Sequence, residues 1–303
     1  MKTDEQQNQA SPAPDRRARD SNAFLKKARR VGKFINALAL VAPRQAGRLA
    51  FRIFCSPRRQ PLRDQDRSFL STAHQSILQA EGLQIRVYTW HSSQKSEKKR
   101  VVLFLHGWES NSGRWRKYVK PICNAGFTVM ALDAPAHGNS SGKQVNLPLY
   151  SRVIKAFMEH YGTPEALVGH SLGGAALVMS MGAFEAPRVR KAVVLSGFAE
   201  TSRVMHDFSR ILGLKPVVSE YINREIEKRS GMRIEQYSVV DKAALLHEVK
   251  GLVLHDQDDD VAPVEEGQLI ADAWNAQFIQ TQGLGHRMQD KSVINHVLAF
   301  LQS

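Results

Sequence analysis

The sequence predicts an α/β fold in which a mainly parallel sheet carries helices on both faces. Short apolar runs rich in β-branched residues, typical of buried parallel strands, recur along the chain and alternate with helical patterns. One such run, 166–168, leads into Gly169-His170-Ser171-Leu172-Gly173-Gly174 and then into a helical stretch of small residues. A serine between two glycines at a strand-to-helix turn indicates a nucleophile held at the edge of a sheet.

The strands are predicted from their apolar runs, and the segment between two of them is predicted to be helical. Residues 94–100 form a polar turn, and 118–125 are predicted to be helical. The segment 198–249 shows only helical patterns, so we expect a small helical cap inserted into the sheet there. The predicted strands are 83–90, 101–105, 127–132, 166–168, 192–195, 252–254 and 277–281.

Composition favours one large globular domain with appendages. The 303 residues are 43% hydrophobic and 23% charged, which is enough apolar surface for a sizeable core. Cys55 and Cys123 are too few and too far apart for a disulfide framework and lack zinc-ligand spacing, consistent with a reducing cytoplasm.

The positive charge is concentrated at the amino terminus. The chain has a net charge of +13, of which residues 1–70 carry +10 and the remaining residues +3. A nucleic-acid-binding domain would carry a basic patch on a folded face. The nearly balanced body therefore predicts no nucleic-acid partner.

The amino terminus itself divides into two segments. Residues 1–20 have almost no bulky apolar side chain, so they are predicted to form a disordered basic tail. Residues 21–58 are predicted to form an amphipathic basic helical arm, interrupted at Pro43. Its apolar stripe comprises Phe24, Ala28, Val31, Ile35, Leu38 and Ala42, and lysines and arginines cover the rest of its first half.

Three interpretations of the arm compete. It packs on the folded body, or it lies on an anionic membrane surface as an interfacial helix, or it belongs to a secretion signal. The long polar segment before it is unusual for a signal. A spanning helix is not expected, because the run 34–42 contains Asn36 and is far shorter than the ~20 apolar residues that a bilayer requires.

Ser171 is the predicted nucleophile. The tight turn strains its backbone, and a side chain at either flanking glycine would clash with the neighbouring strand or helix. The helix that follows directs its backbone N–H groups and its positive end at the reaction centre. The alternative is a glycine-serine cluster in an ordinary loop, which the strand before it and the helix after it make a poor fit.

His106-Gly107-Trp108 closes the strand 101–105 and is the predicted oxyanion loop. Acyl transfer needs two preorganised donors for the developing oxyanion. The backbone N–H groups of Leu172 and Trp108 are the expected pair. The imidazole of His106 is expected to be structural and to anchor this loop.

A general base and an orienting acid are expected to follow the serine in the order acid, then histidine. His286, in a glycine-rich turn after the predicted last strand, has the order and the loop that a base requires. The acid is expected just past the strand 252–254. That loop carries four carboxylates, Asp256, Asp258, Asp259 and Asp260.

These motifs together resemble the α/β-hydrolase superfamily, in its serine esterase and lipase-like branch, over residues 80–302. His106-Gly107 is similar to its oxyanion loop. Asp133-Ala134-Pro135-Ala136-His137-Gly138-Asn139-Ser140 is similar to its D-x-P-G-H-G-x-S turn, with Ala136 where glycine is usual. Laid on residues 255–263, the family pattern H-G-x-x-D-x-x-V-P selects Asp259 as the acid, with Asp258 and Asp260 as alternatives.

The resemblance implies a mainly parallel eight-stranded sheet with the cap after its sixth strand. It also implies a catalytic triad of Ser171, Asp259 and His286, with no metal and no cofactor. The expected activity is hydrolysis of a small-molecule ester or thioester through an acyl-enzyme. An acyltransferase, a hydrolase of amide or C–C bonds, and a non-catalytic binding protein are the alternatives. A cytoplasmic location is expected, with peripheral contact at the inner membrane surface through residues 21–58 as a further hypothesis.

Overall fold

The computed structural model describes residues 16–92, 94, 100–184 and 189–303. Part of the predicted tail, residues 1–15, and most of the predicted polar turn lie outside the described residues. The first helix begins at Arg16, so the chain is already helical within the segment predicted to be disordered up to residue 20. The strands that the sequence predicts all occur and in the predicted order.

One sheet of eight strands forms the centre of the molecule, in the order β1-β2-β4-β3-β5-β6-β7-β8. The pairs β1–β2 and β2–β4 are antiparallel, and every other neighbouring pair is parallel. The predicted mainly parallel sheet is confirmed. The strands are β1 (His74–Ala80), β2 (Leu83–Trp90), β3 (Arg100–Leu105), β4 (Phe127–Leu132), β5 (Ala166–His170), β6 (Lys191–Leu195), β7 (Lys250–Asp256) and β8 (Gln277–Thr281).

The strand β1 was not predicted, because its sequence, HQSILQA, contains neither a continuous apolar run nor a regular alternation of apolar and polar residues. It is an edge strand with most of its side chains exposed, so it needs no long hydrophobic run. The inner strands, by contrast, are buried on both faces. In β3, Val102 and Phe104 join the core on one side, while Leu103 and Leu105 join the core on the other.

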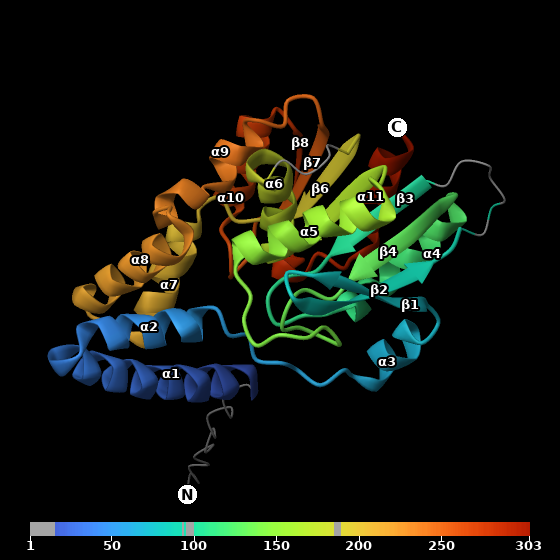
Figure 1. Cartoon of the computed structure of the whole chain (residues 1–303). Helices are drawn as coiled ribbons and strands as arrows, with labels where there is room; N and C mark the ends of the chain where they lie inside the picture. Colours follow the sequence, from blue (N-terminus) through green and yellow to red (C-terminus); the bar gives the residue numbers. More distant parts are fainter. Residues whose placement is uncertain (1–15, 93, 95–99, 185–188) are drawn as a thin grey trace, which may run out of the picture.

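Helices cover both faces of this sheet (Figure 1). α5, α6 and α10 share one apolar core, and α4 and α11 share the other. The helices of the body are α3 (Asp64–Leu70), α4 (Arg116–Asn124), α5 (Leu147–Tyr161), α6 (Leu172–Ala183), α10 (Val264–Trp274) and α11 (Lys291–Gln302), with short 3-10 helices η1 (Ser112–Trp115) and η3 (Gly285–Arg287).

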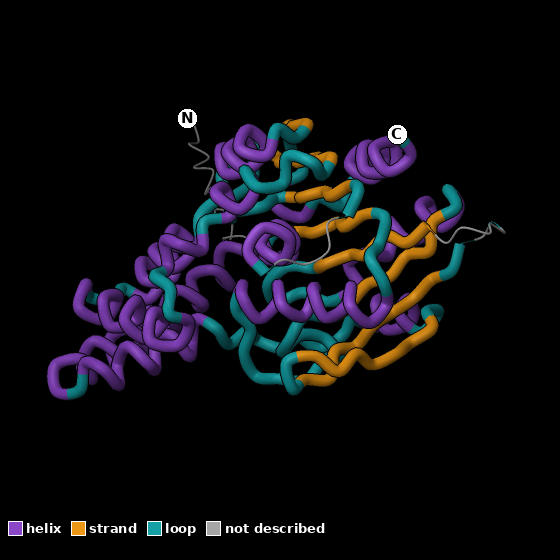
Figure 2. Tube along the Cα trace, turned by 45° about the horizontal axis from the view of Figure 1, so that its top comes forward, coloured by secondary structure: helices purple, strands orange, loops and turns teal. Residues whose placement is uncertain are grey.

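The cap lies where it was predicted, between the sixth and seventh strands. It consists of α7 (Thr201–Leu212), α8 (Pro216–Ser230), η2 (Ile234–Tyr237) and α9 (Val239–Ala243). The arm forms α1 (Arg16–Val41) and α2 (Pro43–Phe54), which pack against α7 and α8. These four helices lie together at one end of the molecule in both Figure 1 and Figure 2.

Contacts between arm and cap are close and specific. The Asn36 amide donates to the Gly213 carbonyl and accepts from the Lys215 N–H, both at 2.8 Å, so one side chain closes the turn between α7 and α8. Gly47 faces Tyr221 so tightly that a Cβ on Gly47 would lie 2.5 Å from the Tyr221 Cβ. Within the described residues, no helix is long and apolar enough to cross a membrane.

Replacing Gly47 with alanine tests this packing. A methyl group there must push α2 away from α8, and such overpacking costs about 1–3 kcal/mol. In a helix that is not tightly packed, the same change would stabilise the protein by about 1 kcal/mol. We therefore expect thermal unfolding to show a lower Tm for Gly47→Ala and little change for the exposed Gln45→Ala on the same helix. A Tm above wild type for Gly47→Ala would contradict the close contact.

Candidate active site

Ser171 stands at the turn between β5 and α6 with φ +52° and ψ −121°, a strained backbone conformation for a residue with a side chain. Its N–H donates to the Leu195 carbonyl at 2.9 Å, which fixes the turn to the neighbouring strand β6. The strained turn projects the serine from the carboxyl end of the strand. Within the described residues, its hydroxyl makes no hydrogen bond to another group, so it is available to a ligand.

The flanking glycines have the steric role expected of them. A Cβ on Gly169 would lie 2.5 Å from the Gly173 carbonyl oxygen, and one on Gly173 would lie 2.3 Å from the Leu105 carbonyl oxygen. Real side chains do not fit at such distances. The turn at Ser171 can therefore pack directly against the end of β3.

The loop after β3 reaches the serine through Gly107. A Cβ on Gly107 would lie 3.0 Å from the Ser171 Cβ. The N–H groups of Trp108 and Leu172, one on each side of this contact, donate to no other described residue. The Trp108 ring is 40% exposed at the surface beside them. Trp108 directly follows Gly107 and Leu172 directly follows Ser171, so each predicted oxyanion donor is next in the chain to a residue of this contact.

His106 holds this loop, and its ring is completely buried. Its Nε2 accepts from the Ala134 N–H at 2.9 Å, so its Nδ1 carries the hydrogen that is donated to the Gly107 carbonyl at 2.8 Å. Burial, with the nearby His137 ring, lowers the pKa of His106 well below its ordinary value. A neutral ring with both nitrogens engaged has a structural role.

The turn after β4 supports the same loop, and Ala136 in this turn has an unfavourable backbone conformation. The His137 Nε2 accepts from the Glu109 N–H at 2.9 Å, next to the predicted oxyanion donor Trp108. Ala136, where the family usually has glycine, is buried with φ +64°. Such a conformation costs an L-residue about 1–2 kcal/mol, so the departure at this position strains the backbone.

Asp259 and His286 form a hydrogen-bonded pair. The His286 Nδ1 lies 2.8 Å from one carboxylate oxygen of Asp259 and 3.1 Å from the other. The Asp259 carboxylate also accepts from the Val261 and Ala262 N–H groups at 2.9 Å each, and it is buried. This arrangement fixes the orientation of the His286 ring.

A second histidine contacts the same carboxylate. The His255 Nε2 lies 3.2 Å from Asp259 and is itself fully buried. Burial alone would raise the pKa of Asp259. The hydrogen bonds from His255, His286 and the Ala262 N–H outweigh burial and hold that pKa far below its ordinary value. Asp259 is therefore ionised throughout the physiological pH range.

The other carboxylates of the acid loop have different positions. Asp256 accepts from the Gly285 N–H at 2.9 Å and from the Thr281 hydroxyl at 2.7 Å, so it ties the acid loop to the histidine loop. Asp258 accepts from the Gly283 N–H at 3.0 Å. Asp260 is exposed. Of these four residues, only Asp259 contacts the imidazole of His286 within the described part of the chain.

His170 docks the histidine loop onto the serine turn. Its Nε2 donates to the His286 carbonyl at 2.7 Å, and the two rings lie 4.8 Å apart between centroids. His170 directly precedes Ser171 in the chain. This contact joins the loop of His286, the predicted base, to the turn of Ser171, the predicted nucleophile. Within the described residues, no hydrogen bond joins the Ser171 hydroxyl to the His286 ring.

Arg114 on η1 is a residue of this site that the sequence did not indicate. Its guanidinium donates to the Nδ1 of His170, and at 2.8 Å to the Arg287 carbonyl. Burial lowers its pKa to about 10. Within the described residues it has no carboxylate partner. No motif marks this position, because the arginine reaches the histidine loop across 173 residues of sequence.

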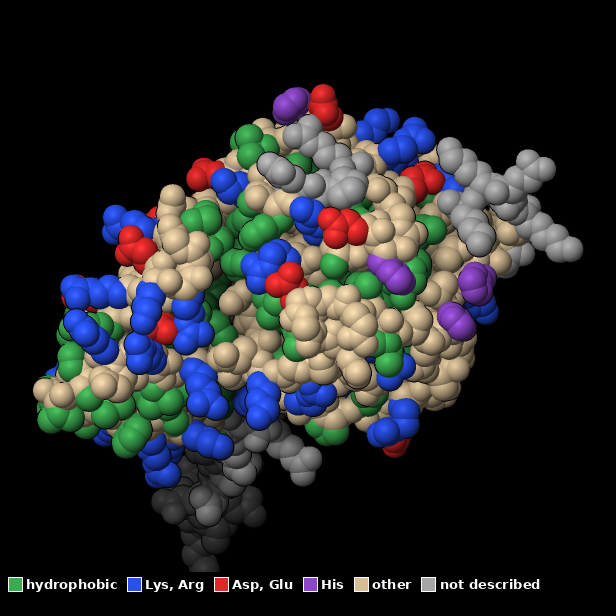
Figure 3. Space-filling model, in the orientation of Figure 1, with side chains coloured by type: hydrophobic (Ala, Val, Ile, Leu, Met, Phe, Trp, Pro, Cys, Tyr) green, Lys and Arg blue, Asp and Glu red, His purple; other side chains and the backbone are tan. Residues whose placement is uncertain are grey.

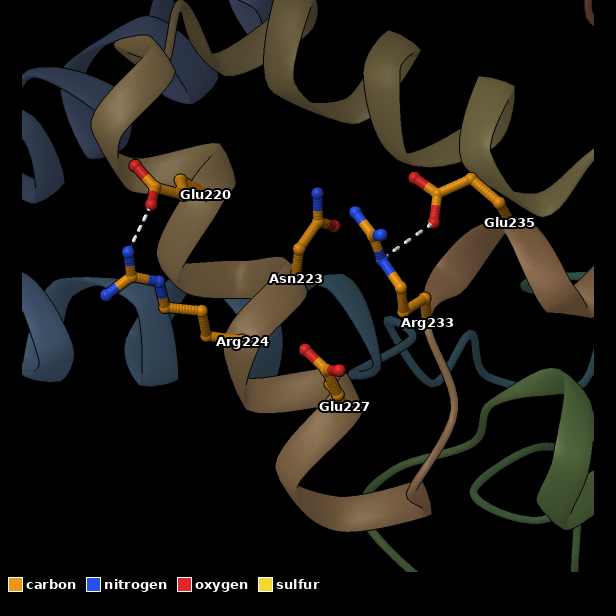
Figure 4. A pocket seen from close by; sticks show the side chains of 6 residues that line it. All are labelled: Glu220, Asn223, Arg224, Glu227, Arg233 and Glu235. Atoms are coloured by element: carbon orange, nitrogen blue, oxygen red, sulfur yellow. Dashed lines mark hydrogen bonds and ion pairs between the residues drawn. The ribbon is translucent and has the colours of Figure 1, made fainter.

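Metal ligands are not clustered in the described part of the chain, and the cap carries a polar hollow. No cluster of three or more His, Cys, Asp or Glu side chains there could hold a metal ion. A polar hollow of about 310 Å³ lies on the cap, away from Ser171 in the sequence and lined by charged side chains of α8 and η2 (Figure 4). Glu220 pairs with Arg224 there, and Arg233 with Glu235, so the lining largely satisfies its own charges.

Comparison with known proteins supports the fold assignment. The family model of the α/β hydrolase fold matches residues 100–214. The chain is 33% identical over 131 residues to a monoacylglycerol lipase of Mycolicibacterium smegmatis, covering 41% of this chain and 43% of that protein. It thus spans less than half the length of that relative. The chain has the α/β hydrolase fold, as the family model and the eight-stranded, mainly parallel sheet both indicate.

Two further matches cover nearly all of the protein to which this chain is similar. The bifunctional esterase/perhydrolase DCH of Acinetobacter calcoaceticus is 27% identical over 256 residues, covering 67% of this chain and 92% of that protein. The structure of Est1E from Butyrivibrio proteoclasticus with bound ferulic acid has a TM-score of 0.58 and 17% identity, covering 75% of this chain and all of that one. At that identity, the second match concerns the fold alone.

The contacts of Arg114 predict an effect on turnover. Arg114→Gln cannot bridge His170 and the Arg287 carbonyl, so the histidine loop loses a support, and misplacement of about 1 Å can cost on the order of 100-fold in rate. With an ester substrate we expect kcat to fall 10- to 100-fold and KM to change little. Arg114→Lys, which can reach one acceptor, should be intermediate, and Lys120→Gln on α4 should behave as wild type. A higher KM with unchanged kcat would instead place Arg114 in contact with substrate.

Proposed function

We propose that this protein is a serine hydrolase that cleaves a carboxylic ester or thioester through an acyl-enzyme intermediate. The observation that carries the proposal is the 2.8 Å contact between Asp259 and the His286 Nδ1, on a loop docked beside the strained turn at Ser171. The printed names of the relatives, a monoacylglycerol lipase and an esterase/perhydrolase, support ester chemistry. The fold by itself would not choose among reactions.

In the proposed mechanism, the Ser171 oxygen attacks the carbonyl carbon while the His286 Nε2 takes the hydroxyl proton. The carbonyl π electrons move to oxygen, and the N–H groups of Leu172 and Trp108 stabilise that oxyanion. The oxyanion collapses, the bond to the alcohol or thiol breaks, and His286 returns the proton to the leaving group. Water then attacks the acyl-enzyme by the same steps and releases the acid.

Asp259 has two tasks in this mechanism. Its hydrogen bond from the Nδ1–H keeps the other ring nitrogen of His286 free to accept the serine proton. Its negative charge stabilises the imidazolium that forms. Because its pKa lies far below the ordinary range, the carboxylate stays charged while His286 gains and loses its proton.

Substrate choice is assigned to the cap in this proposal. In this proposal the hydrolase body, residues 80–302, supplies the chemistry, and the inserted segment 198–249 selects the substrate. An acyltransferase differs only in admitting an alcohol or amine in place of water, and amide or C–C hydrolysis would use the same groups. A cytoplasmic location and peripheral membrane contact stay predictions. The surface that would make such contact lies on α1, away from Ser171 in the fold.

The triad is tested with p-nitrophenyl esters from acetate to palmitate. We expect wild type to hydrolyse part of this series, Ser171→Ala to abolish turnover, and Asp259→Asn to lower kcat by on the order of 10⁴. The neighbouring carboxylates provide matched controls, since Asp258→Asn and Asp260→Asn should retain most of the activity. Equal losses in all three aspartate variants would remove Asp259 from its assigned role, and activity that survives Ser171→Ala would remove the nucleophile.

The oxyanion loop is tested at Gly107. The added methyl group of Gly107→Ala would lie 3.0 Å from the Ser171 Cβ and must displace the Trp108 N–H from the reaction centre. Losing one such donor costs about 10²–10³ in kcat. We expect a loss in that range by steady-state kinetics, with no matching rise in KM. Unchanged turnover would mean that the loop does not contribute a donor.

A further inference from the structure

The outer face of α1 carries large apolar side chains that the fold leaves in solvent. Phe34 is 63% exposed, Leu40 76% and Val41 83%. With 100° between successive helical residues, these three and Ala37 lie within an arc of about 120° on one side of the helix. Folded monomers rarely gather such residues without a partner for them.

This face is not the stripe that the sequence analysis identified. Ala28 and Ile35 of that stripe are buried, and Val31 and Leu38 pack on the core shared with the cap. The cap therefore occupies the predicted apolar stripe, so that stripe is not the surface that would meet a membrane. The membrane interpretation of the arm, which the basic face favoured, stays a prediction. Phe34, Leu40 and Val41 point to the opposite side.

Basic residues extend the outer face toward the start of the helix. Lys26, Arg30 and Lys33 are exposed and fall within the same arc, and the exposed Lys27 lies about 20° beyond its edge. Figure 3 shows the result, with hydrophobic side chains gathered over the end of the molecule where α1 and α2 meet, and Lys and Arg side chains around them.

The charge of the arm has no local compensation. Residues 21–58 contain nine Lys and Arg and no Asp or Glu. Only Arg48 and Arg58 form ion pairs within the described part of the chain, with Glu225 and Glu109. A second copy of this chain is disfavoured as the partner, since two such faces would repel each other. A partner surface with negative charge outside and an apolar layer beneath it would complement both the basic half and the apolar half of the outer face of α1.

We propose that the outer face of α1 docks this protein on an anionic lipid bilayer. Lys26, Lys27, Arg30 and Lys33 contact lipid phosphates, while Phe34, Leu40 and Val41 enter the boundary between headgroups and acyl chains. The cap packs on the inner face of the same helix, so docking holds the cap close to the membrane. This inference does not depend on the reaction at Ser171, and its test measures binding alone.

The test is co-sedimentation of the full chain with vesicles of phosphatidylcholine, with or without about 30% phosphatidylglycerol, at low and physiological salt. One variant replaces Lys26, Lys27, Arg30 and Lys33 with Gln. Its matched control removes the same charge elsewhere, by replacing the exposed Lys120, Lys143, Lys228 and Lys250 with Gln. A third variant replaces Phe34, Leu40 and Val41 with Gln. Circular dichroism and Tm confirm that each variant is folded.

We expect wild type to bind the anionic vesicles at least tenfold more tightly than neutral ones. The α1 charge variant should lose roughly 100-fold in affinity, since each basic residue near an anionic surface contributes about 1 kcal/mol at most. The control should stay within about threefold of wild type, and the apolar variant should lose at least tenfold. Equal binding of the charge variant and its control would overturn the proposal. So would a loss of dimers in the apolar variant, which would assign the face to a second copy.

Discussion

Three backbone segments meet at the carboxyl ends of the central strands with no side chain between them. Gly173 at the start of α6 rests on the end of β3, and Gly107 in the loop after β3 rests on Ser171. This close approach is possible only because these positions lack a Cβ. Ser171 has φ +52° at this contact, and the predicted oxyanion donors Trp108 and Leu172 directly follow Gly107 and Ser171 in the chain. β3 and β5 are neighbouring strands in the sheet, so the loop after β3 and the turn after β5 lie side by side.

Buried polar groups fix the loops around Ser171 and orient the ring of His286. His106 and His137 hold the loop after β3, and Asp256 joins the acid loop to the histidine loop. Asp259 orients the His286 ring from one side. From the other side, His170 and Arg114 hold the main chain of the same segment by its carbonyl oxygens. The imidazole is thus fixed both through its side chain and through its backbone.

The arm gives one helix two surfaces of different chemistry. The inner face of α1 packs on the cap, where Asn36 closes the turn between α7 and α8, and Gly47 on the following helix α2 admits the side chain of Tyr221. The outer face of α1 is basic along one half and apolar along the other. The arm and the cap share one apolar core, so a surface bound by α1 would lie close to the cap helices.

Much of this architecture was determined by local sequence. The parallel sheet, the cap after the sixth strand and the glycine-flanked turn at Ser171 follow from runs, periods and steric demands that a few neighbouring residues express. The edge strand β1 lacked such a signal, since an exposed edge requires no continuous apolar run. The spacing of carboxylates left Asp256, Asp258, Asp259 and Asp260 equivalent until a family pattern was laid on them. Tertiary structure decided which carboxylate meets His286, which face of α1 the cap covers, and that Arg114 supports a loop 173 residues away. These outcomes depend on contacts between distant segments, and local periodicity carries no information about which segments will meet.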